Sequence, residues 1–131
     1  MKVSKEFQLK ILVVDDHAMT RNLVRSILRA LGFTDILIAE DGRAAYRVMD
    51  EEGNIDLVVC DWNMPGGTGI DFLKMARSDP RFGSVPFIML TAEAYEDKIQ
   101  EAIASGVTDY IVKPFTAGVL TDKVKRALNL P

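Results

Sequence analysis

The sequence predicts an α/β fold in which five parallel strands alternate with five helices, a (βα)₅ three-layer sandwich. Three observations lead to it: short apolar runs, helical patterns between those runs, and turn or capping residues at the joins. The runs are continuous rather than alternating, so they suit strands that are buried on both faces of a parallel sheet. They are Ile11–Val14, Ile36–Ala39, Leu57–Cys60, Phe87–Leu90 and Tyr110–Val112.

The first helix is predicted from the longest apolar stripe in the chain. Apolar residues recur there at every fourth position, and two more widen the stripe. Gly32 then stands where the residue just beyond a helix C-terminus belongs. The stripe consists of Met19, Leu23, Ile27 and Leu31, widened by Val24 and Leu28.

Shorter stripes predict the other four helices, and polar residues or glycine mark their ends. Thr68 and Asp71 form an S/T-x-x-D/E start signal for the third helix. Thr116 is a plausible N-cap for the fifth, and the fourth ends near Gly106. The stripes are Ala44, Ala45, Val48 and Met49; Phe72, Leu73, Met75 and Ala76; Ile99, Ala102 and Ile103; and Leu120, Val124, Ala127 and Leu128.

Length and composition favour one globular domain over residues 1–131, with no output domain attached. The net charge of −3 argues against a general nucleic-acid binder. No stretch approaches 18 uninterrupted apolar residues, so no membrane insertion is expected, and Met1–Lys10 lacks a signal-peptide pattern. The single cysteine, Cys60, excludes an internal disulfide and indicates a reducing compartment, so we expect a cytoplasmic protein.

Chemically distinctive residues follow four of the five predicted strands. Asp15 and Asp16 come after the first strand, Asp61 after the third, Thr91 after the fourth and Lys113 after the fifth. Ligands of open α/β sheets bind outside the carboxyl ends of the strands, so these side chains are expected to meet there.

The predicted cluster suits an aspartyl-phosphate site. Three close carboxylates repel one another unless a cation shares them, and hard oxygen ligands suit Mg²⁺. Zinc is not expected, because Cys60 and His17 are the only soft or nitrogen ligands nearby. Asp61 can act as nucleophile, while a threonine hydroxyl and a lysine ammonium suit the phosphoryl oxygens.

Four motifs together resemble the receiver domains of two-component response regulators, and most closely the CheY-like chemotaxis regulators. The resemblance runs from about Lys10 to Leu128, and it implies a flavodoxin-like sandwich with the parallel sheet order 2-1-3-4-5. The motifs are Val13-Val14-Asp15-Asp16, Asp61-Trp62-Asn63-Met64-Pro65, Thr91-Ala92-Glu93-Ala94 and Lys113-Pro114-Phe115.

The resemblance also implies a role for each site residue. Asp61 would be the phosphoacceptor, assisted by Thr91 and Lys113, with a cis bond between Lys113 and Pro114. Asp16 and Asp61 would ligate Mg²⁺ directly together with the backbone carbonyl of Asn63, and Asp15 would act through water. Thr91 and Tyr110 would form the switch, and Asn63 and Glu93 would tune the lifetime of the phosphate.

The implied function is signalling rather than turnover of a substrate. The protein would promote its own phosphorylation and dephosphorylation without being an enzyme in the usual sense. Its phosphodonor would be a CheA-like histidine kinase, with a phosphatase as a further partner. Its target, the flagellar switch protein in chemotaxis or another protein, would bind the face made by the fourth helix, fifth strand and fifth helix.

Three departures from the CheY-like pattern bear on these expectations. The double glycine of Gly66-Gly67-Thr68-Gly69 should loosen the loop after Asp61 and affects the expected Mg²⁺ affinity. Tyr95-Glu96 stands where two lysines are familiar, which weakens the case for an acidic flagellar target. His17 replaces a familiar aromatic, and its two readings are a solvated residue at the helix start and a pH-sensitive gate.

Other functional classes remain as alternatives. A lone receiver can pass phosphate onward in a phosphorelay or act in non-flagellar signalling. A haloacid-dehalogenase-like phosphatase would need Asp-x-Asp after the first strand, where Asp15 and Asp16 are adjacent. A flavodoxin-like FMN carrier would need a phosphate loop there, and two aspartates would repel that phosphate. Tyr110 as a packing residue and Trp62 as a cover over the site edge are the plainer readings of those side chains.

Overall fold

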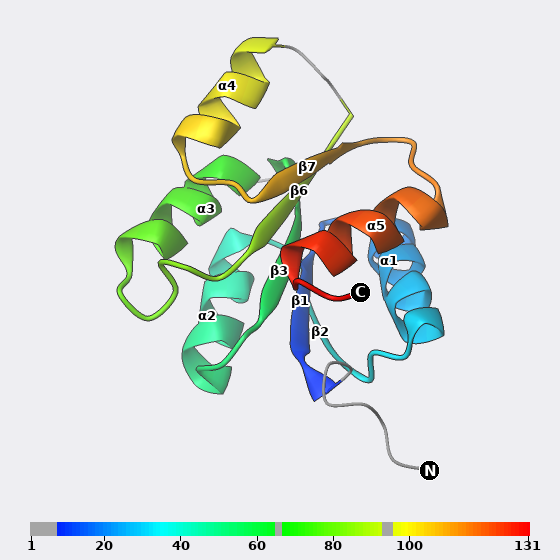
Figure 1. Ribbon diagram of the computed structural model, residues 1–131. Coiled ribbons are helices and arrows are strands. Elements are labelled where there is room, and N and C mark those ends of the chain that lie inside the picture. Colours follow the sequence, from blue (N-terminus) through cyan, green and yellow to red (C-terminus); the bar gives the residue numbers. More distant parts are fainter. Residues whose placement is uncertain (1–7, 65–66, 93–95) are drawn as a thin grey trace.

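The computed structural model describes residues 8–64, 67–92 and 96–131, and its centre is a five-stranded parallel sheet (Figure 1). The strand order is β2-β1-β3-β6-β7, which confirms the predicted order 2-1-3-4-5. Each predicted strand is present and is one residue longer than predicted. The extra residue is the first of β1, β2 and β7, and it is the last of β3 and β6, where it is Asp61 and Thr91. The strands are β1 Lys10–Val14, β2 Asp35–Ala39, β3 Leu57–Asp61, β6 Phe87–Thr91 and β7 Asp109–Val112.

Five helices cover the two faces of the sheet and form two separate apolar cores (Figure 1). Helices α1 and α5 pack on one face, and α2, α3 and α4 contribute side chains to the core on the other. Alternate strand residues supply both cores, which explains why the strand sequences are continuously apolar. The helices are α1 Ala18–Leu31, α2 Gly42–Glu52, α3 Gly69–Ser78, α4 Glu96–Ala104 and α5 Ala117–Ala127.

The predicted helix ends are confirmed. Gly32 has a φ of 113° and closes α1 with its N–H on the carbonyls of Leu28 and Arg29. Thr68 and Asp71 make both hydrogen bonds of a capping box at the start of α3. Thr116 accepts from the Val119 N–H at the start of α5. Because these residues satisfy backbone groups that a helix leaves unpaired, the local sequence sets where each helix begins or ends.

The apolar stripe of α1 is only partly the buried one. Val24 and Leu28, which were expected to widen the stripe, are fully buried. Met19 and Leu23, which were expected to begin it, are 86% and 50% exposed. An α-helix has 3.6 residues per turn, so a row at every fourth residue rotates by about 40° per step and leaves the buried face. The every-fourth-residue prediction was therefore wrong for the first half of the helix.

A short hairpin that the sequence analysis did not predict follows β3. Strands β4 (Asn63–Met64) and β5 (Gly67–Thr68) pair antiparallel, with Asn63 opposite Thr68 and Met64 opposite Gly67. The expected loosening of this loop concerned residues that include Gly66, which lies outside the described residues. Two-residue strands are too short for a periodic signal, so pattern reading does not detect them.

Gly69 lets α3 begin directly beneath the end of β3. Its N–H donates to the Trp62 carbonyl at 2.8 Å. A Cβ at this position would overlap the Asp61 carbonyl oxygen and the Met89 side chain. Steric contact therefore explains why glycine occupies position 69, the last position of the Gly66-Gly67-Thr68-Gly69 loop. The hydrogen bond of Gly69 also holds the end of β3, which carries Asp61.

Replacing Gly69 with alanine is expected to destabilise the protein by about 1–3 kcal/mol, the usual cost of overpacking a closed site. The measurement is the free energy of unfolding by urea. Gly118→Ala is the matched control, because a Cβ there meets only the Thr116 hydroxyl oxygen, at 3.8 Å. That control should be neutral or more stable by about 0.4–1 kcal/mol. Equal effects of the two substitutions would contradict the steric explanation.

Among the described residues, none of the helices combines the length and the apolar character needed to cross a membrane.

Candidate functional site

The carboxyl ends of four strands bring the predicted site residues to one edge of the sheet. Asp61 and Thr91 are the last residues of β3 and β6, and Asp15 and Lys113 directly follow β1 and β7. Backbone hydrogen bonds tie neighbouring strand ends together, including Lys113 N–H to the Thr91 carbonyl at 2.7 Å. The side chains therefore converge because of the strand order, although Lys113 is 52 residues from Asp61 in sequence.

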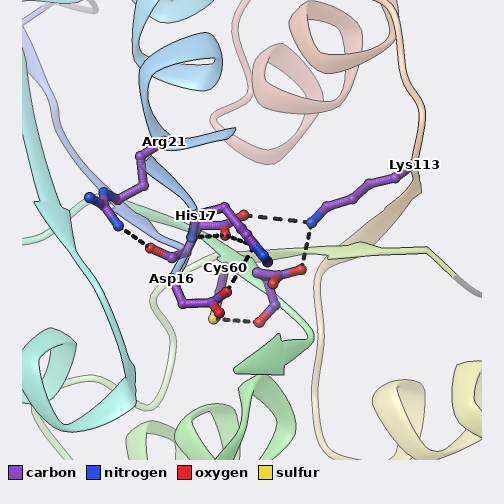
Figure 2. Close-up of polar contacts among 7 residues, drawn as sticks. Asp16, His17, Arg21, Cys60 and Lys113 are labelled. Atoms are coloured by element: carbon purple, nitrogen blue, oxygen red, sulfur yellow. Dashed lines mark hydrogen bonds and ion pairs between the residues drawn. The ribbon is translucent and has the colours of Figure 1, made fainter. Parts of the chain in front are cut away.

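Lys113 reaches into the site from one side, opposite Asp16 and His17 (Figure 2). Its Nζ donates to Asp61 Oδ1 at 2.7 Å and lies 3.6 Å from Asp15 Oδ2. The Asp15 and Asp61 side chains are only 1% and 4% exposed. One ammonium group thus faces two buried carboxylates, and the site keeps an excess of negative charge.

A cation would relieve that excess. One ligand atom from each of Asp15, Asp16, His17 and Asp61 lies within 4.8 Å of all the others. Asp15 Oδ2 and Asp16 Oδ1 are buried atoms that accept no hydrogen bond from the part of the chain that the structure describes. Buried polar atoms are normally satisfied, so two unsatisfied carboxylate oxygens that share a cluster fit a metal ligand set.

The pKa of the Asp61 carboxyl is raised, and burial is the largest cause of the shift. The neighbouring Asp15 and Asp16 charges raise this pKa further, and the Lys113 ammonium opposes them. The buried Cys60 thiol also has a pKa raised by burial, and it donates to the Asp61 carbonyl at 3.3 Å. Cys60 is completely buried and belongs to the apolar core.

Comparison with known proteins agrees with this geometry. The family model described as the response regulator receiver domain matches residues 11–125. The chain belongs to the response regulator receiver family.

Several relatives of this receiver are chemotaxis proteins. The chemotaxis protein CheY of Pseudomonas aeruginosa is 48% identical over 90% of this chain and 94% of its own. CheY-3 of Vibrio cholerae is 47% identical over 90% of each chain, and CheY1 of Helicobacter pylori is 41% identical over 92% of this chain and 98% of its own. The solved structure of Vibrio cholerae CheY4 has a TM-score of 0.85 at 34% identity, covering 92% of this receiver and 98% of that chain.

For two of the residues expected to act in this receiver, the side chain or the whole residue lies outside the described part of the chain. Asn63 is described as part of the backbone of β4, without its side chain, and Glu93 lies outside the described residues. Thr91 is 1% exposed, and the Lys113–Pro114 bond is cis as expected. Tyr110 is half-buried against the core, with its ring centroid 5.8 Å from Lys123 Nζ.

Trp62 and Arg21 differ from the sequence-based expectation. Trp62 is 4% exposed and belongs to the apolar core, so it does not merely cover the site edge. Arg21 was not foreseen: its guanidinium donates to the Asp15 carbonyl at 2.7 Å and holds the β1–α1 turn (Figure 2). Its position four residues beyond His17, one turn into α1, is the only signal in the sequence, and that signal is weak.

Asp61→Asn is expected to raise the thermal midpoint of the metal-free receiver at pH 7. A buried carboxyl with a raised pKa favours the protonated form in the folded state. Its charge therefore costs stability above the folded pKa and costs nothing well below the ordinary value of 3.8. The gain of the variant should shrink as the pH falls toward 4, and Mg²⁺ should stabilise the wild type more than the variant.

Differential scanning calorimetry measures these midpoints. Asp122→Asn is the control, because it removes one negative charge from an exposed position on α5. A metal-free Asp61→Asn protein that melts below the wild type would show that Lys113 already balances the site.

Proposed function

We propose that this receiver is a single-domain response regulator that accepts a phosphoryl group on Asp61 from a histidine kinase. The pairing of Lys113 with Asp61, beside two buried carboxylate oxygens that accept no hydrogen bond from the described residues, is the observation that carries the proposal. The proposal includes a change of its α4-β7-α5 face on phosphorylation, and the flagellar motor switch as the target in chemotaxis.

The transfer exchanges one phosphoryl bond for another. The N–P bond of a phosphohistidine breaks as an Asp61 carboxylate oxygen forms the new O–P bond. The departing imidazole nitrogen keeps the electron pair of the broken bond, and a proton from solvent neutralises it. Lys113 Nζ, 2.7 Å from Asp61 Oδ1, is placed to balance the negative charge that gathers on the phosphoryl oxygens. The Thr91 hydroxyl is assigned a hydrogen bond to one of these oxygens.

Mg²⁺ is the proposed cofactor, held by Asp16 and Asp61 with the backbone carbonyl of Asn63, and by Asp15 through water. The oxygen-rich cluster supports this assignment, as do its two buried oxygens that accept no hydrogen bond from the described residues. When bound, the ion neutralises phosphoryl charge and orients the incoming group. Asn63 and Glu93 are assigned the tuning of phosphate lifetime.

Thr91 and Tyr110 are proposed as the switch that connects the site to the binding face. Thr91 of β6 lies opposite Val112 of β7 in the β6–β7 ladder. Tyr110 is on the same strand as Val112, two residues before it. A shift of Thr91 toward a phosphoryl group would therefore act on the packing around Tyr110. The effect on a partner depends on how far phosphorylation changes the population of the two states.

The α4-β7-α5 face has the apolar character that a protein target needs. One large apolar side chain from each of its elements is exposed by 39–57%: Ile103 from α4, Val112 from β7 and Val119 from α5. Exposed apolar side chains of this kind offer contacts to a protein partner. The chemotaxis relatives favour the flagellar switch as the partner.

A phosphorelay or another non-flagellar pathway is the second candidate. Tyr95-Glu96 in place of basic residues favours it, because an acidic target segment would gain less from this helix start. Turnover of phosphate esters is not proposed, since Asp15 and Asp16 are adjacent rather than separated as a haloacid-dehalogenase site requires. The reduced Cys60 and the charge balance suit a cytoplasmic protein that binds neither nucleic acid nor membrane.

Fluorescence of Trp62, the only tryptophan, is expected to report activation because this residue directly follows Asp61. Mg²⁺ with beryllofluoride, a phosphoryl mimic, should change the emission. A flagellar-switch peptide should then bind the activated protein at least about tenfold more tightly, a coupling of about 1.4 kcal/mol.

Asp61→Asn is the control. Mg²⁺ with beryllofluoride should neither change its emission nor tighten its binding of the peptide. A fluorescence change with equal peptide affinity in both states would contradict the flagellar target and favour the phosphorelay. No fluorescence change in the wild-type protein would contradict the proposed receiver chemistry.

A further inference from the structure

His17 directs its side chain toward the acidic cluster instead of capping its helix. It occupies the N-cap position of α1 with extended backbone angles, and its side chain makes no capping hydrogen bond. Its Nδ1 lies 3.1 Å from Asp16 Oδ1 and 3.3 Å from Asp15 Oδ1 (Figure 2). The ring nitrogen makes a hydrogen bond with Asp15 Oδ1, so His17 is more than a solvated residue at the helix start.

The separation of His17 Nδ1 from Asp16 Oδ1 matches that of neighbouring ligands of a single ion. Two ligand atoms at about 2.1 Å from one metal, in adjacent coordination positions, are roughly 3.0–3.4 Å apart. The distance of 3.1 Å between His17 Nδ1 and Asp16 Oδ1, a proposed direct ligand, falls in that range. One atom from each of Asp15, Asp16, His17 and Asp61 also fits within 4.8 Å of the others.

A second observation points independently to a ligand at this place. Asp15 is 1% exposed, and its Oδ2 accepts no hydrogen bond. Its other oxygen, Oδ1, accepts from the His17 backbone N–H at 2.8 Å, which fixes the carboxylate in this orientation. The nearest ammonium, Lys113 Nζ, is 3.6 Å from Oδ2 and is already bonded to Asp61. The cluster therefore has a buried acceptor for which the described residues supply no hydrogen-bond donor.

We propose that His17 is a metal ligand, and that this receiver consequently binds transition ions such as Mn²⁺, Co²⁺ or Ni²⁺ more tightly than Mg²⁺. The inference rests on the proposed cation site and adds a nitrogen donor to it. Imidazole is a good ligand for these ions, whereas Mg²⁺ retains oxygen ligands and water. Ligation by Nδ1 requires the neutral tautomer with its proton on Nε2. The His17 side chain is 68% exposed, so an ion can reach it from solvent.

The test compares His17→Phe with the wild-type receiver, both without an affinity tag. Phenylalanine keeps a flat ring and the backbone N–H that orients Asp15, and it removes only the nitrogen donors. Isothermal titration calorimetry would measure the affinities of both proteins for Ni²⁺ and Mg²⁺. We expect the substitution to weaken Ni²⁺ binding about tenfold or more and to change Mg²⁺ binding by less than about threefold.

Pulsed electron paramagnetic resonance of bound Mn²⁺ supplies a direct readout. The wild-type protein should show coupling of the ion to an imidazole nitrogen, and His17→Phe should lack it. Asp61→Asn should weaken the binding of both Ni²⁺ and Mg²⁺. This variant therefore shows how loss of the whole site differs from loss of the single His17 donor.

An equal change for Ni²⁺ and Mg²⁺ in His17→Phe, or a Mn²⁺ spectrum without nitrogen coupling, would overturn the inference. With wild-type Mg²⁺ binding intact, those results would leave the proposed receiver function in place. Failure of the wild-type protein to bind either ion would overturn the inference and the proposed Mg²⁺ chemistry together.

Discussion

The excess of negative charge at the carboxyl ends of the central strands is the constraint on which the rest of this structure depends. Asp15 and Asp61 are buried, and the single ammonium of Lys113 stands between them. Burying carboxylates without full compensation costs free energy, so a fold keeps such a group only where something else compensates it. The two cores on either side of the sheet supply the stability that permits this arrangement. The same uncompensated charge suits a cation, and it is the physical basis of the proposed phosphoryl transfer.

The backbone holds this charge cluster with little freedom. Gly69 allows α3 to start against the Asp61 carbonyl, and Arg21 secures the turn that carries Asp15. Lys113 follows β7, whose ladder with β6 also contains Thr91. A change at the phosphoryl site would therefore be felt along the β6–β7 edge, next to the exposed apolar side chains of the α4-β7-α5 face. Packed elements with discrete arrangements transmit such changes better than isolated side chains do.

Much of this arrangement could be predicted from the sequence because the topology of a parallel sheet constrains it. Continuous apolar runs identified the strands, and residues that follow strands in such a sheet must meet at one edge. The stripe of α1 was misjudged because a four-residue repeat does not match the 3.6-residue turn, which leaves Met19 exposed. The β4–β5 hairpin is too short for any period. The burial of Trp62 and the direction of the His17 ring depend on tertiary packing and on rotamers, which no local pattern encodes.

The most direct test of the central claim is to locate the phosphoryl group chemically. The protein would be incubated with Mg²⁺ and phosphoramidate, a small phosphodonor, and then treated with borohydride, which reduces an acyl phosphate to an alcohol. Peptide mass spectrometry would identify the reduced residue. Asp61 is predicted to be the modified position, with no labelling in the absence of Mg²⁺ or in Asp61→Asn. Labelling of another residue, or labelling of Asp61 that is unaffected by removal of the divalent ion, would contradict the role assigned to this charge cluster.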